Sequence, residues 1–81
     1  MDATDWHVER VGGNVYIVTG RTRPGLLVRA AGREVFAASD GSFRLQISST
    51  SSEANFEIGD DRGNRTGFVI SMRNGAVLRR Y

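Results

Sequence analysis

The sequence predicts an all-β fold of short antiparallel strands, and three observations lead to this prediction. Ten glycines are spread along the chain, and turn-forming residues separate short runs in which apolar and polar residues alternate. No segment shows a sustained helical period of apolar residues. Two turns of different chemistry, at residues 22–25 and 40–41, are spaced so that the strands around them fold back on one another.

The first two expected strands flank a glycine turn. Residues 6–11 alternate in character, with Trp6 and Val8 on one face, and Gly12-Gly13-Asn14 ends this strand. Residues 15–19 are apolar on both faces, so alternation alone does not say which face is buried. A central strand, or a strand covered on both faces, would explain this pattern.

The next segment is a strand pair introduced by a proline turn. Pro24 presets φ near −65° and Gly25 accepts a positive φ, so together they predict a type II turn. Residues 26–30 then alternate as a half-buried strand, residues 31–33 turn the chain, and residues 34–38 return as a second strand.

The clearest strand signal follows Asp40-Gly41, a dipeptide typical of hairpin turns. Phe43, Leu45 and Ile47 alternate with polar residues and are expected to face inward. Residues 48–52 are a run of serine and threonine and indicate a loop.

Two further strands and a hairpin complete the expected fold. Residues 53–58 alternate as a half-buried strand, and residues 59–64 form a turn. Asn74-Gly75 predicts a two-residue type I′ hairpin turn that would place Phe68 opposite Tyr81.

Several of these features occur in the order found in a known family. They are Gly20, T-R-P-G at residues 22–25, Val28, Gly32, Val35, D-G-S-F at residues 40–43 and D-x-x-G-N at residues 60–64. This order resembles bacterial immunoglobulin-like domains, and carboxypeptidase-regulatory-like and transthyretin-like modules resemble its central part. The resemblance covers roughly residues 16–69. It implies an antiparallel immunoglobulin-like β-sandwich of about seven short strands, with Tyr16 and Val18 facing inward.

The resemblance also implies a role, because such modules serve as stalks, spacers and ligand-binding decks in exported bacterial proteins. We therefore expect a non-enzymatic structural or protein-interaction module, periplasmic or on the cell surface. Its expected partners are neighbouring domains of a parent protein or another envelope protein. The polar residues 1–4 and the lack of a signal peptide lead us to expect one domain, residues 1–81, excised from a larger protein.

The core must be held by apolar packing alone, because the chain of 81 residues contains no cysteine. A domain this small is only marginally stable unless the side chains on its inward faces form a well-packed core. The residues expected in the core are Val18, Leu26, Val28, Val35, Phe43, Leu45, Ile47, Phe56, Ile58, Phe68 and Ile70.

No residue pattern in the chain predicts catalysis, a metal site or a bound cofactor. His7 is the only histidine and lacks the converging partners of a catalytic triad or a zinc site. The serines of residues 48–52 are not in a nucleophile-elbow context. The turn at residues 60–64 offers too few oxygen ligands for calcium, and Arg62 within it opposes a cation. We expect no enzyme.

A possible binding surface consists of Trp6, Arg73, Arg79, Arg80 and Tyr81. Trp6 either packs in the core or at a domain junction, or forms an exposed platform for a sugar or a partner chain. The other four residues are the only local concentration of cationic and aromatic groups. They are either a charged edge strand that prevents sheet-to-sheet association or a docking surface for an acidic partner.

Two alternative functions remain open at this point. A glycan- or peptidoglycan-binding module would use Trp6, Tyr16 or Tyr81. A small basic nucleic-acid-binding β-barrel is suggested by basic residues that are all arginine, with a net charge of +2. Nucleic acid is nevertheless disfavoured as a partner, because the 11 arginines are scattered among nine acids. No apolar run reaches the length of a membrane span.

Overall fold

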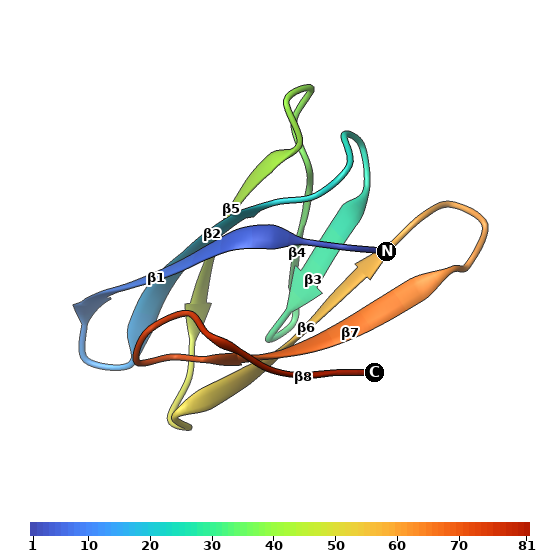
Figure 1. Cartoon of the computed structure of the whole chain (residues 1–81). Coiled ribbons are helices and arrows are strands. Elements are labelled where there is room, and N and C mark those ends of the chain that lie inside the picture. The colour runs from blue at the N-terminus through green and yellow to red at the C-terminus, as the bar shows by residue number, and fades with distance from the viewer.

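The computed structural model describes residues 1–81 as two packed antiparallel sheets without a helix (Figure 1). One sheet has three strands in the order β1-β2-β5, and the other has five in the order β4-β3-β6-β7-β8. The all-β sandwich predicted from the sequence is confirmed, with one strand more than the seven or so expected. The strands are β1 (Thr4–Gly12), β2 (Val15–Arg21), β3 (Leu27–Ala30), β4 (Arg33–Phe36), β5 (Ser42–Ser48), β6 (Glu53–Gly59), β7 (Arg65–Ser71) and β8 (Val77–Arg80).

The core lies between the two sheets and is built from alternate residues of the strands. Every residue predicted for the core is buried except Val35, which is only partly buried. Val35 lies on β4, the outer strand of its sheet, so a neighbouring strand covers it on one side only. Ala30 and Met72 also belong to the core, and Trp6 packs against it.

Strand β2 contains the segment that is apolar on both faces, and its position in the sheet shows which residues face the core. It is the central strand of the three-stranded sheet, with Val18 fully buried and Tyr16 partly buried against the core. Val15 and Ile17 alternate with these residues and are half-buried. The central-strand interpretation is therefore correct, and the inward direction of Tyr16 and Val18 is confirmed.

The turns around β3 follow the backbone preferences of their residues. Gly25 has a φ of 78°, as a type II turn after Pro24 requires. The two-residue turn between β3 and β4 is made by Ala31 and Gly32, with φ values of 51° and 75°. Positive φ at both central residues is the geometry of a type I′ hairpin, although Ala31 is not a residue that favours it.

The Asp40-Gly41 turn forms, but the expected hairpin does not. The chain reverses through a 2.8 Å hydrogen bond from the Gly41 N–H to the Ala38 carbonyl. The strands on either side then separate: β4 pairs with β3 in one sheet, and β5 pairs with β2 in the other. The Thr22 N–H donates to the Gly41 carbonyl at 2.8 Å, which fixes this turn to the connection between β2 and β3. The turn therefore carries the chain from one layer to the other.

The Asn74-Gly75 prediction is wrong in turn type. Gly75 has a φ of 76°, but Asn74 does not have the positive φ that a type I′ turn requires. The N–H of Gly75 bonds to the Ser71 carbonyl, and the N–H of Ser71 bonds to the Ala76 carbonyl, both at 2.9 Å. Residues 72–75 thus form a longer loop, in which Asn74 Oδ1 accepts the Ala76 N–H at 2.9 Å.

The predicted register of the last strand is wrong as a consequence. Ile70 faces Val77, two residues from the predicted partner Arg79, and an irregularity between Val69 and Ile70 reduces the error to one residue at Phe68. Phe68 faces Arg80 instead of Tyr81, while Gly67 and Tyr81 exchange backbone hydrogen bonds of 2.7 and 2.9 Å. Contacts with distant segments accompany the longer loop. The Met72 N–H donates to the Ser52 carbonyl at 2.8 Å, and Gly75 lies against the backbone of Trp6.

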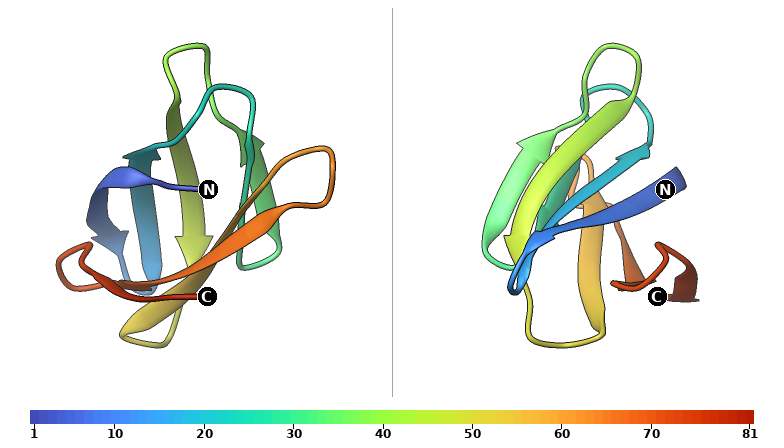
Figure 2. Two further views of the ribbon diagram at one scale, coloured as in Figure 1. Left: turned by 45° about the vertical axis from the view of Figure 1, so that its right-hand side comes forward. Right: turned by 90° about the vertical axis from the view of Figure 1, so that its left-hand side faces the viewer.

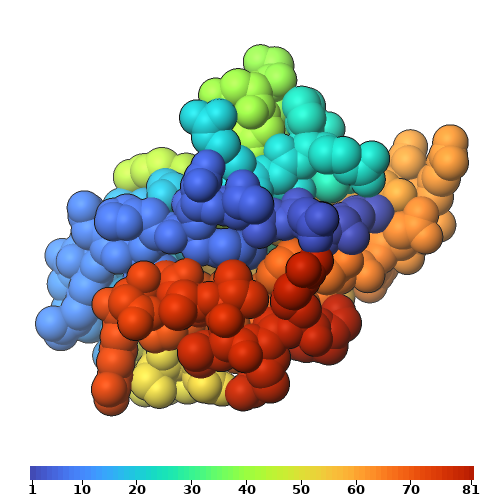
Figure 3. All heavy atoms as spheres, viewed as in Figure 1, coloured from blue at the N-terminus to red at the C-terminus, as the bar shows by residue number.

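The two ends of the chain lie on the same side of the molecule, with the N-terminus above the C-terminus in both views of Figure 2. The Arg80 guanidinium pairs with the Asp2 carboxylate, and the amino group of Met1 donates to Thr66 Oγ1 at 2.7 Å. Figure 3 shows the loop after β7 packed against β1. A Cβ on Gly75 would lie 3.0 Å from the carbonyl oxygen of Trp6. This side of the sandwich is therefore closed by packing.

Candidate functional site

Trp6 lies inside the sandwich rather than on an exposed platform. Its ring makes edge-on or tilted contacts with three phenylalanines, with centroid separations of 5.3 Å to Phe43, 5.1 Å to Phe56 and 5.5 Å to Phe68. Its indole Nε1 is buried without a hydrogen-bond partner. Such packing stabilises the core, and the ring is not available to stack on a sugar.

The two arginines of β8 are engaged within the molecule. Arg79 donates to Glu53 Oε1 at 2.9 Å. Arg80 pairs with Asp2, and its guanidinium carbon lies 5.4 Å from the ring centroid of Phe68. Both side chains are thus partly neutralised by carboxylates from other segments of the chain.

Tyr81 and Arg73 lie at opposite ends of the same hairpin. Tyr81 is 71% exposed, yet its ring covers Gly67, where a Cβ would overlap it. Arg73, in the loop after β7, makes no ion pair. The hairpin therefore carries four of the five residues proposed from the sequence, but Arg73 lies at its loop end, away from Arg79, Arg80 and Tyr81. Trp6 lies below them, since Phe68 contacts both Trp6 and Arg80.

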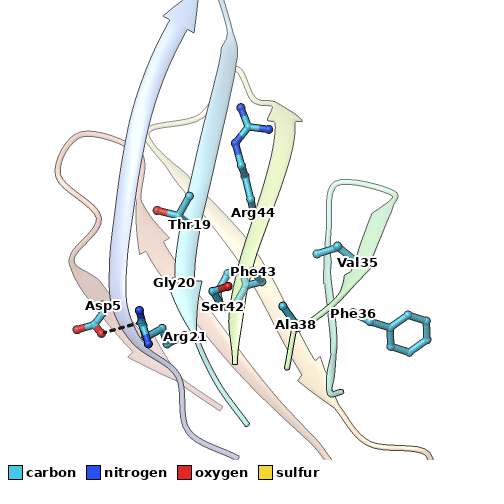
Figure 4. Close-up of a pocket in the computed structure, with 10 residues that line it drawn as sticks. All are labelled: Asp5, Thr19, Gly20, Arg21, Val35, Phe36, Ala38, Ser42, Phe43 and Arg44. Atoms are coloured by element: carbon cyan, nitrogen blue, oxygen red, sulfur yellow. Dashed lines mark ion pairs between the residues drawn. The ribbon is translucent and has the colours of Figure 1, made fainter. Parts of the chain in front are cut away.

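The opposite side of the sandwich is hollowed by an open groove of about 530 Å³. It lies where β2 and β5 of one sheet approach β4 of the other (Figure 4). Its residues form a polar rim and an apolar wall. The rim includes Asp5, Thr19, Arg21 and Arg44, and the wall includes Val35 and Ala38.

Local backbone features shape this groove. Asp5 has a φ of 58° and lies in a bulge at the start of β1, next to Thr4, which is the residue paired with Arg21. The Asp5 carboxylate lies 3.8 Å from Arg21 Nε. Gly20 lets the ring of Phe43 lie against β2, because a Cβ there would be 2.6 Å from that ring. The chain thus closes the floor of the groove with an aromatic ring.

The rim of the groove has an excess of positive charge. Arg44 makes no ion pair, and Arg21 has only the long contact with Asp5. Asp40 lies near Arg21, but its carboxylate accepts the Ser42 hydroxyl at 2.6 Å and the Ser42 N–H at 2.9 Å. These two hydrogen bonds, with a smaller contribution from Arg21, lower the pKa of Asp40 below 3.8. Arg44 is therefore the free cation of the groove.

The outer face of the five-stranded sheet is neutralised by its own charges. Arg29 lies 3.2 Å from Glu34 and 3.8 Å from Glu57, and Arg65 lies 3.4 Å from Glu57. A small hollow of about 140 Å³ lies among these groups. Because each arginine there has a carboxylate partner, the face offers no concentrated positive patch.

The Asp60 turn uses its carboxylate for its own backbone. Asp60 Oδ2 accepts the Asn64 side-chain amide at 2.8 Å. Asp60 Oδ1 accepts the N–H groups of Arg62 and Asn64 at 2.9 and 3.0 Å. The side-chain bond from Asn64 is the main reason that the pKa of Asp60 falls below 3.8. The Asp60 oxygens considered as calcium ligands therefore accept hydrogen bonds from within the turn itself.

The sequence does not single out the groove residues. In the sequence pattern, Arg44 is only an outward residue of an alternating strand, and Arg21 is one of many scattered arginines. They come together because β2 pairs with β5, which places Arg44 opposite Thr19 and Ser42 opposite Arg21. No local pattern specifies that pairing.

The molecule has no cluster of three or more histidine, cysteine or acidic side chains that could hold a metal ion. None of its elements is a helix long and apolar enough to cross a membrane. Compared with known protein families, characterised proteins and solved structures, the chain matches none.

Proposed function

We propose that this protein is a non-enzymatic, immunoglobulin-like protein-interaction module of a larger exported bacterial envelope protein. Its partner is a neighbouring domain or another envelope protein, in the periplasm or at the cell surface. The compartment and the parent protein follow from the sequence resemblance alone.

The strand order supports the immunoglobulin-like assignment. The order β1-β2-β5 corresponds to strands A-B-E, and the order β3-β6-β7 corresponds to strands C-F-G, of the immunoglobulin fold. The fourth strand differs from constant-type domains, because β4 pairs with β3 instead of joining the sheet of β5. Strand β8 is an addition beside β7.

The observation that carries the interaction role is the open side of the sandwich. Strands β5 and β4 are the outer strands of their sheets on this side, and the groove lies between them. On the opposite side, the loop after β7 packs against β1. An open groove flanked by two strand edges is a common setting for recognition of an extended chain.

Phage display with random peptides tests this proposal on the immobilised domain. Enriched peptides are then synthesised and titrated into the ¹⁵N-labelled protein, with scrambled sequences as controls. We expect saturable shifts confined to β4, β5 and the groove. If no peptide gives saturable shifts, or if the shifts lie only on the β7–β8 hairpin, the open side is not the interaction surface.

A further inference from the structure

We propose that the free edge of β5 takes up an extended acidic peptide as an added strand, with Arg44 binding its carboxylate. This inference rests on the proposed interaction function and names the partner's chemistry. It follows from the direction of the backbone groups along β5, from the lack of a partner for Arg44, and from the apolar wall beside them.

The hydrogen bonds at the two ends of β5 fix the direction of its backbone groups. At one end, the Ser42 carbonyl accepts the Ala38 N–H at 2.8 Å and the Ser42 N–H donates to Asp40, so both groups point away from β2. At the other end, the Ser49 N–H donates to the Asn14 carbonyl at 2.8 Å, toward the β2 side. These two anchors agree with strict alternation between them.

The alternation leaves a row of unused backbone groups. The N–H and C=O groups of Arg44, Gln46 and Ser48 point to the free edge, away from β2. No strand pairs with this edge, and no turn or loop bond reaches these three residues. All three are exposed. The edge can therefore form main-chain hydrogen bonds with an extended chain without breaking any bond of the fold.

The side chains along this edge determine which charge the bound peptide should carry. Arg44 and Gln46 lie on the outer face, beside Thr19 and Ile17 of β2. A residue of an added strand directly opposite Arg44 would place its side chain on the same face, where a carboxylate pairs favourably with the guanidinium. Since Arg44 has no carboxylate of its own, the binding displaces no internal ion pair.

The neighbours of that acidic residue would face the apolar wall of the groove. Successive side chains of a strand point to opposite faces, so the residues before and after the acid turn toward Val35 and Ala38. The preferred peptide therefore has an apolar–acidic–apolar core in extended conformation. A second copy of this chain is a poorer occupant, because antiparallel pairing of its β5 about Gln46 would place Ser48 opposite Arg44 and supply no carboxylate.

The first experiment measures charge selectivity by fluorescence anisotropy. Labelled peptides with a Val-Glu-Val, Val-Gln-Val or Val-Lys-Val core are titrated against the wild-type domain and two charge-reversal variants. Arg44→Glu tests the site, and Arg62→Glu is the matched control on the turn between β6 and β7. We expect the Glu peptide to bind best, and about a tenfold loss with Arg44→Glu only. The Lys peptide should bind Arg44→Glu better than the wild type.

The second experiment tests main-chain pairing. Gln46→Pro removes an N–H that the fold does not use, so the variant should keep the wild-type circular dichroism and lose peptide binding. Two N-methylated Glu peptides give an independent test. One carries methyl groups on the amides that would point toward β5 and should not bind. The other carries them on the alternate amides, which point to solvent, and should bind like the unmodified peptide. The amides of Arg44 and Gln46 should exchange more slowly when peptide is bound.

Several results would overturn the inference. Equal affinity for the Glu and Gln peptides, or full binding by Arg44→Glu, removes the acidic specificity. Equal binding of both methylated peptides removes the added strand. A dimer in sedimentation that protects Arg44 and Gln46 without peptide makes a second copy the occupant. If display-selected peptides still bind at the groove in any of these cases, the proposed function stands and only this inference fails.

Discussion

Thr22 and Gly41 are in direct backbone contact, next to the groove residues Arg21 and Ser42. The Thr22 N–H donates to the Gly41 carbonyl at 2.8 Å, and a side chain at position 41 would overlap the Thr22 carbonyl oxygen. This contact joins the β2–β3 connection to the turn between β4 and β5. It therefore holds together the two segments that border the groove.

Replacing Gly41 with alanine should destabilise the domain more than the same change at Gly63. Both glycines have positive φ, 84° and 88°, so both variants lose about 1 kcal/mol to backbone strain. Only Gly41 meets backbone when a Cβ is added, while Gly63 has nothing within 4 Å. We expect Gly41→Ala to cost a further ~2 kcal/mol from this steric overlap. The shift in urea midpoint measures the cost. Equal midpoints for the two variants would contradict the contact.

Replacing Ala31 with asparagine should stabilise the domain. Ala31 has a φ of 51° as the first central residue of a type I′ turn, a position that asparagine tolerates better. We expect a gain of about 0.5–1 kcal/mol in the free energy of unfolding, seen as a higher urea midpoint with an unchanged slope. A lower midpoint would show that the turn does not limit stability in this way.

Two phenylalanines close together in sequence should respond very differently to truncation. Phe43 is 4% exposed and contacts Trp6, whereas Phe36 is 69% exposed on β4. Phe43→Ala should cost about 3–5 kcal/mol and unfold much of the protein at room temperature. Phe36→Ala should change the free energy of unfolding by about 0.5 kcal/mol or less. Chemical denaturation followed by Trp6 fluorescence measures both, and a wild-type midpoint for Phe43→Ala would refute the core assignment.

Acid should weaken the fold partly through Asp60. Its pKa is below 3.8 in the folded state, chiefly because of the Asn64 side-chain bond, so its contribution is present above the unfolded value. That contribution is lost as the pH falls through the folded pKa. The stability of Asp60→Asn should consequently decline less steeply than that of the wild type below about pH 4. Asp61→Asn is the matched control, since that carboxylate accepts no hydrogen bond, and parallel curves for wild type and Asp60→Asn would count against this effect.

Nucleic acid should bind weakly at most. Arg29, Arg65, Arg79 and Arg80 each lie within ion-pair distance of a carboxylate. The arginines without a carboxylate partner are spread over different strands and turns, so they cannot line up along contiguous phosphates. Labelled single- and double-stranded oligonucleotides should show micromolar or weaker affinity that disappears at physiological salt. Sub-micromolar affinity at that salt, lost with Arg79→Ala and Arg80→Ala, would make the β8 arginines a binding site.

Elements with one buried face were the most predictable from the sequence. Strand β5 alternates strictly because Phe43, Leu45 and Ile47 enter the core while Arg44 and Gln46 meet water. The turn at Pro24-Gly25 was predictable because the allowed φ values of the two residues define its type. In both cases the information lies within a few neighbouring residues.

Features that depend on distant packing were not predictable. Turn chemistry at Asp40-Gly41 specifies a reversal, but not which sheet receives the next strand. At Asn74-Gly75, turn chemistry specifies a two-residue loop, but the loop of residues 72–75 is longer and is held by distant contacts, from the Met72 N–H to the Ser52 carbonyl and from Gly75 to the backbone of Trp6. The groove could not be predicted from the sequence for the same reason, because only the pairing of β2 with β5 brings Arg21 near Arg44.

The pairing of Asp2 with Arg80 has a mechanical consequence. Tension applied through these two positions would act first on that ion pair and on the bond from Met1 to Thr66. It would then peel β1 and β8 away from their sheets. Hydrogen bonds that are loaded one after another give way at lower force than bonds loaded together. A pull on these two positions should therefore open the sandwich from β1 and β8, the outer strands of the two sheets.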